Sequence, residues 1–266
     1  MFDGDRMDGL KTLFQTERCE QIVRGESGAE VYHLPDIEAY LKVAERGAFC
    51  DLTRERDALE WLSRKALVPK VLGFETHDDK EYLLTSAIAG SPASDLLSSD
   101  DISVRTAAAI LEKAAVALRS IHYLDITRCL LEERLDAKFA RAWKNIQKSF
   151  LSEARREFVL EHGGKLPEEV HGELNERRPL NEDLVFIHGD PCMPNIIVLD
   201  GEISGFIDLD GAGVADRYTD FAVLFGSFKR NCRLDVDHER IFFEAYGLID
   251  IDREKLDFYI ALDDLF

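Results

Sequence analysis

The first part of the chain shows the short apolar runs, separated by turn residues, that are typical of β-strands. One helix interrupts them, because apolar residues recur at helical spacing over 52–67 and Pro69 follows. The runs that predict strands are 22–23, 31–32, 39–44, 71–74 and 81–85. A glycine-containing turn at 25–28 joins the first two of these runs. This part is therefore predicted to be a sheet with one inserted helix.

Beyond a connector of small residues that begins at Ala89, the pattern becomes mainly helical. A long helix is predicted over 104–123 and a charged helical region over 134–159, followed by a break at Gly163-Gly164 and a more polar helix after Pro167. Apolar strands return at 184–187, 196–198 and 203–207, and helices should close the chain. We expect an α+β protein with an N-terminal lobe over 1–88, a connector over 89–97 and a mainly helical lobe over 98–266.

The net charge of the chain limits the classes of molecule that it can bind. The chain carries 52 acidic against 33 basic side chains, a formal net charge of −19. Such a field repels the phosphates of nucleic acid and of anionic membranes, and it favours cationic small molecules. No run approaches the roughly 18 apolar residues of a membrane span, the first residues lack a basic signal-peptide start, and the five cysteines are widely spaced. We expect a cytoplasmic protein with reduced thiols.

The residues most specific for chemistry lie in two neighbouring segments. Asp190 follows a buried strand, Asn195 comes five residues later, and Asp208 ends another short strand. Phosphoryl transfer needs a carboxylate for the acceptor hydroxyl, and an amide oxygen and a second carboxylate to hold Mg²⁺. Each residue alone is more often a turn or cap residue. The three together indicate a phosphotransferase.

From His188 to Asn195, and again at Asp208, the sequence resembles the signature of the aminoglycoside phosphotransferases, whose fold is similar to that of protein kinases. The resemblance runs from the glycine turn at 25–28 to the last residues. It implies a bilobal protein-kinase-like fold, a catalytic base at Asp190, Mg²⁺ ligands at Asn195 and Asp208, and ATP or GTP as phosphate donor.

The same resemblance implies how the first lobe binds the nucleotide. Lys42 lies on an apolar strand and Glu55 early in the next helix, as the lysine–glutamate pair of kinases requires, although Glu60 on the same helix is a competing partner. Further nucleotide contacts are expected from the backbone of the turn, from a tyrosine over the adenine that could equally be a core residue, and from the main chain of the connector: Ser27, Gly28, Tyr40, Ser86 and Ile88.

Three polar residues near the catalytic segment have structural interpretations. His188 is expected to be a buried hydrogen-bonding residue that shapes the loop, and not an acid or base. Asp216 and Asp220 are expected to brace the same loop or to cap the next helix.

Acidic residues crowd the end of the chain, which alone is usually a solvated face. In the resembling family this segment lines the drug pocket, so Asp263, Asp264 and the terminal carboxylate of Phe266 are expected to bind a cationic aminoglycoside. Glu157 is a candidate for the opposite wall. We expect no nucleic-acid or membrane partner, and a monomer or weak dimer.

The acceptor hydroxyl is less sharply indicated. Segments 24–28, 129–135 and 188–195 are similar to streptomycin 3″-phosphotransferases, whereas 262–266 looks like the kanamycin/neomycin 3′ branch. Asp210-Gly211 replaces the Gly-Arg usual in that branch, which affects rate more than reaction class. We favour transfer of the ATP γ-phosphate to the streptomycin 3″-hydroxyl, giving antibiotic resistance. The alternatives are a 3′-phosphotransferase, a kinase of another amine alcohol or sugar, and, least favoured, a non-catalytic nucleotide-binding scaffold.

Overall fold

The computed structural model describes residues 18–22, 29–47, 50–147 and 164–266. Internal contacts divide the chain into two compact units. The first comprises Met1–Ala89 together with Ser204–Asp210, and the second comprises Gly90–Ile203 and Gly211–Phe266. Strands dominate the described part of the first unit and helices that of the second, which confirms the α+β class.

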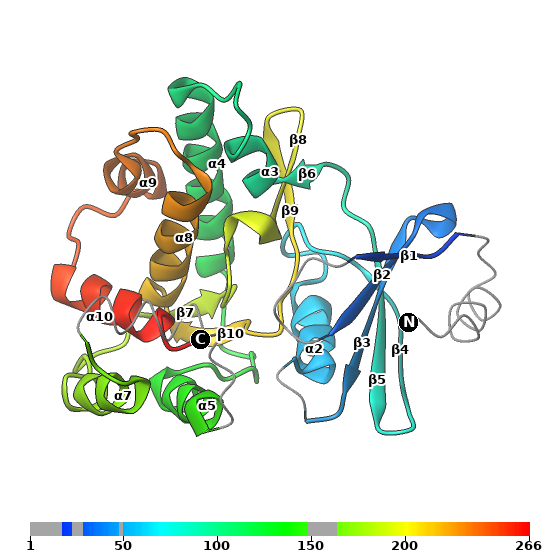
Figure 1. Cartoon of the computed structure of the whole chain (residues 1–266), viewed down its shortest axis with the longest axis horizontal. Coiled ribbons are helices and arrows are strands. Elements are labelled where there is room, and N and C mark those ends of the chain that lie inside the picture. The colour runs from blue at the N-terminus through cyan, green and yellow to red at the C-terminus, as the bar shows by residue number, and fades with distance from the viewer. Residues whose placement is uncertain (1–17, 23–28, 48–49, 148–163) are drawn as a thin grey trace. The chain divides into compact units, whose positions relative to one another are not determined.

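An antiparallel sheet of five strands forms the body of the first unit (Figure 1). Alternate residues of its central strand, Ala39, Leu41 and Val43, are buried, so Tyr40 and Lys42 lie on the opposite face of the sheet. In sheet order, the strands are β1 (Glu20–Ile22), β2 (Glu30–Leu34), β3 (Ala39–Glu45), β5 (Lys80–Ser86) and β4 (Val71–His77). The expected strands of this unit are therefore present, with β4 and β5 longer than predicted.

Helix α2 (Leu52–Leu62) is the helix inserted between β3 and β4. Asp51 caps it, because its carboxylate accepts the backbone N–H of Arg54 at 3.0 Å. The prediction that this helix continues to residue 67 is wrong. Ser63 leaves the helical conformation and Arg64 adopts a left-handed φ of 66°, which ends the helix well before Pro69.

The segment Ser204–Asp210 joins the first unit along the residues that follow α2 and β5. The N–H of Phe206 donates to the carbonyl oxygen of Leu67 at 2.9 Å, and the Ser204 hydroxyl donates to that of Ala89 at 2.7 Å. Gly205 permits this approach, since a Cβ there would lie 2.8 Å from the Leu67 oxygen. The segment that carries Asp208 is therefore attached to the first unit.

The second unit is mainly helical and contains the β7–β10 strand pair (Figure 1). Helix α3 and strand β10 were not predicted, because each is too short, at five and four residues, to show a clear apolar pattern. The unit's elements are β6 (Ser91–Pro92), α3 (Ala93–Leu97), α4 (Val104–His122), α5 (Leu135–Gln147), α7 (Pro167–Glu176), β7 (Leu184–Ile187), a 3₁₀ turn (Met193–Asn195), β8 (Ile196–Leu199), β10 (Gly213–Asp216), α8 (Tyr218–Asn231), α9 (His238–Tyr246) and α10 (Arg253–Asp263), with β9 (Glu202–Phe206) leading into the first unit.

Aromatic side chains from α8 and α9 form a buried core in the second unit. The ring of Phe221 meets those of Phe242 and Tyr246 edge to face, with centroids 5.3 and 5.0 Å apart. Phe225 contacts Phe242 in the same way at 5.1 Å. This core supports α8, and Asp220 on α8 binds the loop after β7. None of the described helices has the length and hydropathy that a bilayer crossing requires.

Candidate active site

The loop after β7 carries the predicted catalytic base. His188 is completely buried and Asp190 is half-buried at the point where the chain emerges. Gly189 between them has a φ of 92°, and a Cβ at this position would overlap the carbonyl oxygen of Gly211. Only glycine therefore allows the loop to pass so close to the segment before β10.

Asp190 and Asn195 are joined directly within this loop. The Asn195 side-chain amide donates to the Asp190 carboxylate and to the Asp190 carbonyl oxygen, both at 3.0 Å. The Asp190 N–H donates to Nδ1 of His188 at 3.2 Å. The carboxylate is therefore held in position, and the Asn195 side chain turns its nitrogen inward and keeps its amide oxygen for another ligand.

Asp220, in the first turn of α8, holds the backbone of this loop. Its carboxylate accepts the backbone N–H groups of His188 and Gly189, each at 2.8 Å, and Nε2 of His122 at 2.9 Å. Burial alone would raise the pKa of Asp220, but the hydrogen bonds and charge of the two histidines outweigh it and lower that pKa below 3.8. Asp220 is thus ionised, and its predicted bracing role is confirmed.

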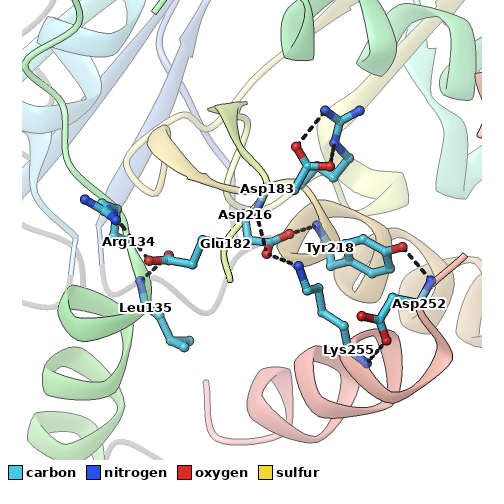
Figure 2. A network of polar contacts seen from close by, with 9 residues as sticks. Arg134, Leu135, Glu182, Asp183, Asp216, Tyr218, Asp252 and Lys255 are labelled. Carbon is cyan, nitrogen blue, oxygen red and sulfur yellow. Dashed lines mark hydrogen bonds and ion pairs between the residues drawn. The ribbon is translucent and has the colours of Figure 1, made fainter. Parts of the chain in front are cut away.

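Asp216 is the centre of a second polar network, shown in Figure 2. Its carboxylate accepts the N–H groups of Asp183 and Tyr218 and pairs with the Lys255 ammonium, each at 3.0 Å. The Tyr218 hydroxyl accepts the N–H of Asp252 at 2.8 Å. The expected contact at the start of α8 is confirmed, and the network also ties α10 to the chain just before β7.

The first unit brings three of the predicted residues together around one ammonium group. Nζ of Lys42 lies 2.7 and 2.9 Å from the two carboxylate oxygens of Glu55 and 2.7 Å from Oδ1 of Asp208. Burial lowers the pKa of Lys42, but the charges of Asp208 and Glu55 outweigh it and raise the pKa, so the lysine is protonated. Glu60 is exposed, so α2 offers Glu55 as the partner of Lys42.

The predicted metal ligands supply the oxygen donors that Mg²⁺ prefers. Asp208 provides a carboxylate, and it has an unusual left-handed φ of 66° for a residue with a side chain. Asn195 provides an amide oxygen, since its nitrogen already binds Asp190. The chemistry of both residues therefore fits a magnesium ion.

The remaining predicted nucleotide residues have mixed outcomes. Ser27 and Gly28 lie outside the described residues. Tyr40 shares the sheet face of Lys42, and its ring stacks on His33 with centroids 4.7 Å apart. The N–H of Ser86 already donates to the carbonyl oxygen of Lys70 at 2.9 Å, so this donor is used within the unit. The side chain of Ile88 packs beside Gly205. The nucleotide contact expected from Ile88 involves its main chain and stays a prediction.

The predicted substrate residues lie at the end of α10. Asp263 ends the helix, Asp264 follows it, and both are half-buried. The ring of Phe266 lies under two cations of α5, with centroid distances of 5.0 Å to Lys138 and 5.3 Å to Arg141. Glu157 lies outside the described residues.

Lys138 and Arg141 were missed by sequence reasoning. Lys138 is 5% exposed, and burial lowers its pKa although the charge of Asp263 acts against that change. Its position gave a signal, because it falls on the buried stripe of α5 with Leu135 and Phe139. A lysine at a core position of an amphipathic helix is rarely buried without a partner.

Taken together, a sheet unit with a buried lysine–glutamate pair and a helical unit with an aspartate–asparagine loop define a phosphotransferase with a protein-kinase-like fold. Residues 19–259 match the model of the phosphotransferase enzyme family, and the chain belongs to that family. It is therefore an enzyme. The resemblance to aminoglycoside phosphotransferases is confirmed by individual relatives.

Two relatives illustrate the sequence similarity. An aminoglycoside 3′-phosphotransferase of Niallia circulans is 37% identical over 260 residues, covering 97% of this chain and 95% of that protein. A streptomycin 3″-kinase of Streptomyces griseus is 35% identical over 259 residues, covering 92% and 90%.

Solved structures give the same picture. The aminoglycoside phosphotransferase APH(3″)-Id of Streptomyces rimosus matches with a TM-score of 0.85 and 30% identity, over 100% of this chain and 99% of that one. A type VIII aminoglycoside 3′-phosphotransferase matches with a TM-score of 0.82 and 27% identity, over 99% and 100%. The kinase-like fold expected from the sequence is confirmed.

Proposed function

We propose that this protein is an aminoglycoside O-phosphotransferase that transfers the γ-phosphate of ATP, or of GTP, to a drug hydroxyl, with the 3″-hydroxyl of streptomycin as the favoured acceptor. The observation that carries the reaction is the hydrogen bond between Asp190 and Asn195 in the loop after β7. The likeness to APH(3″)-Id, which has also been solved with ADP and streptomycin, supports the choice of acceptor.

In this proposal Asp190 acts on the acceptor. Its carboxylate orients the hydroxyl so that the oxygen attacks the γ-phosphorus while the bond to the ADP oxygen breaks. The hydroxyl proton passes to Asp190 late, because the transition state is loose and the hydroxyl is still largely protonated when the leaving group departs. The two bonds from Asn195 keep the carboxylate in the required orientation.

Lys42 acts on the nucleotide. Its protonated ammonium binds phosphate oxygens, and Glu55 holds it at the sheet face where it is needed. Asn195 and Asp208 are the residues that would hold Mg²⁺, which when bound neutralises charge on the phosphates. Because Lys42 lies 2.7 Å from Asp208, it also limits the repulsion between that carboxylate and the phosphates.

Recognition of the drug rests on negative charge. Asp263 and Asp264 present two neighbouring carboxylates at the end of α10, and the chain as a whole carries a net charge of −19. Ammonium and guanidinium groups form their strongest hydrogen bonds with carboxylates. Streptomycin and the kanamycins both carry such groups, so these residues support the drug class more than one member of it.

A second acceptor, the 3′-hydroxyl of kanamycin or neomycin, is favoured by the sequence relatives, most of which are 3′-phosphotransferases. The relative from Niallia circulans, at 37% identity over 97% of this chain, is a 3′-phosphotransferase.

The test is steady-state phosphate transfer from MgATP to streptomycin and to kanamycin in parallel, with Asp190→Ala as the control. We expect turnover of streptomycin, addition of one phosphate at the 3″ position by NMR, and loss of turnover in Asp190→Ala with nucleotide binding retained. Turnover of kanamycin alone would overturn the favoured acceptor in favour of the second. Turnover of neither drug, with ATP still bound, would overturn the aminoglycoside assignment.

A further inference from the structure

The first turn of α2 contacts the backbone of the segment after Asp208. Nε of Arg54 donates to the carbonyl oxygen of Asp210 at 3.3 Å. Burial raises the pKa of the next helix residue, Glu55, and the backbone N–H of Leu209 acts to lower it. The first turn of α2 therefore holds this segment through the Arg54 hydrogen bond.

The first turn of α2 is itself fixed to the sheet. The hydroxyl and backbone N–H of Thr53 both donate to the carboxylate of Glu81 on β5, at 2.8 and 3.2 Å. The backbone N–H of Arg54 is capped by Asp51. The Arg54 guanidinium thus binds Asp210 from a helix turn that is itself held in place by Glu81 and Asp51.

The segment needs such support because of the backbone of Asp208. Its φ of 66° lies in the left-handed region, which costs energy for any residue with a Cβ and persists only where the surroundings impose it. Lys42 holds the Asp208 side chain, but it does not fix the direction of the following peptides. The hydrogen bond of the Asp210 carbonyl group with Arg54 on α2 supplies that restraint.

We propose that Arg54 is a positioning residue for Asp208. By holding the Asp210 carbonyl group on α2, it keeps the Asp208 carboxylate in the orientation that binds magnesium. The proposal rests on the proposed phosphotransferase function, in which Asp208 is a magnesium ligand. It assigns Arg54 no contact with the nucleotide or the drug.

The test compares Arg54→Met and Arg54→Lys with a matched control, Arg56→Met. Arg56 lies on the same helix, but its guanidinium pairs with Asp57 and stacks over Phe74, with 4.5 Å to the ring centroid. Binding of a non-hydrolysable ATP analogue is measured by calorimetry with Mg²⁺ and with EDTA. The Mg²⁺ concentration for half-maximal turnover, kcat and the KM for the drug are then measured separately.

We expect Arg54→Met to bind the analogue in EDTA as the wild type does. The gain in analogue affinity on adding Mg²⁺ should be about tenfold smaller than in the wild type, since one charged hydrogen bond is lost. The Mg²⁺ requirement should rise, kcat should fall and the drug KM should stay unchanged. Arg54→Lys keeps a donor and should lie between Arg54→Met and the wild type, and Arg56→Met should match the wild type. If Arg54→Met does not fold, Arg54→Lys carries the same comparison.

An unchanged Mg²⁺ dependence in a folded Arg54 variant would overturn the proposal, as would an equal effect in Arg56→Met. A rise confined to the drug KM would also overturn it, because that would place Arg54 at the substrate. If no drug is phosphorylated by the wild type but the Mg²⁺-dependent binding still shifts in the Arg54 variants, the proposed function fails and the role of Arg54 stands.

Discussion

The carboxylate of Asp220 accepts the backbone N–H of Gly189 at 2.8 Å, across 31 positions of sequence. The same carboxylate accepts the N–H of His188, so both peptides that lead into Asp190 are fixed by one buried side chain. The loop that carries the proposed base Asp190 is therefore positioned by α8, whose core contacts are aromatic, and not by contacts within the loop alone.

Replacing Asp220 by Asn should weaken this support. An amide has one acceptor oxygen, and its NH₂ group would face backbone donors, so at least one buried N–H loses its partner. We expect the free energy of unfolding to fall by about 2–4 kcal/mol and kcat to fall as well. Urea unfolding measures the first change. Asp250→Asn, at an exposed position, is the control and should leave both quantities unchanged.

Asp220 should also contribute to stability in a pH-dependent way. Its pKa is lower in the folded protein than the 3.8 of an ordinary aspartate, so the unfolded chain takes up the proton first. The contribution is complete above about pH 4 to 5 and is lost as pH falls through 3.8 toward the folded pKa. Urea unfolding between pH 3 and 6 should show a shallower acid decline in Asp220→Asn. An identical slope in the two proteins would contradict this.

Gly189 and Gly172 should respond oppositely to alanine. Alanine at Gly189 must adopt a φ near 92° and would overlap the Gly211 carbonyl, so we expect a loss of about 2–4 kcal/mol and little turnover. Gly172 lies in α7, and no described atom is within 4 Å of its Cβ position. Alanine there should stabilise the protein by about 0.5–1 kcal/mol. Thermal unfolding of the two variants is the measurement, and a tolerated Gly189→Ala would show that the loop can move.

Glu55→Gln should separate nucleotide binding from drug binding. Glutamine can still accept a hydrogen bond from Lys42 but has no charge to hold it, so the lysine is less well placed for phosphates. We expect the KM for ATP to rise about tenfold with little change in the KM for the drug. Glu60→Gln, at an exposed site on the same helix, is the matched control. Equal effects of the two variants would mean that the Lys42 pair is not the cause.

Sequence reasoning proposed site residues where residue type and chemistry are tightly linked. Asp190, Asn195 and Asp208 were proposed because phosphoryl transfer needs those oxygen donors, and Asp220 was expected to brace the loop or to cap the next helix. The end of α2 was missed, since the left-handed Arg64 is a property of local backbone that no apolar pattern reveals.

Pairings between distant residues were also out of reach. The bond of His122 to Asp220 spans 98 positions, and only the tertiary structure brings these residues of α4 and α8 together. Lys138 shows an intermediate case. Its place on the apolar stripe of α5 could have marked it as unusual. Its contact with the Phe266 ring could not be predicted, because that contact depends on the tertiary structure.

The attachment of Ser204–Asp210 to the first unit has a consequence for synthesis of the protein. Lys42 pairs with Asp208, which lies 166 residues further along the chain, so this ion pair cannot form until Asp208 has left the ribosome. Closing so long a loop is slow compared with forming the local hairpins. A fragment of residues 1–89 would therefore leave a charged lysine–glutamate pair uncovered, and complementation between two fragments should succeed only when the second includes residues 204–210.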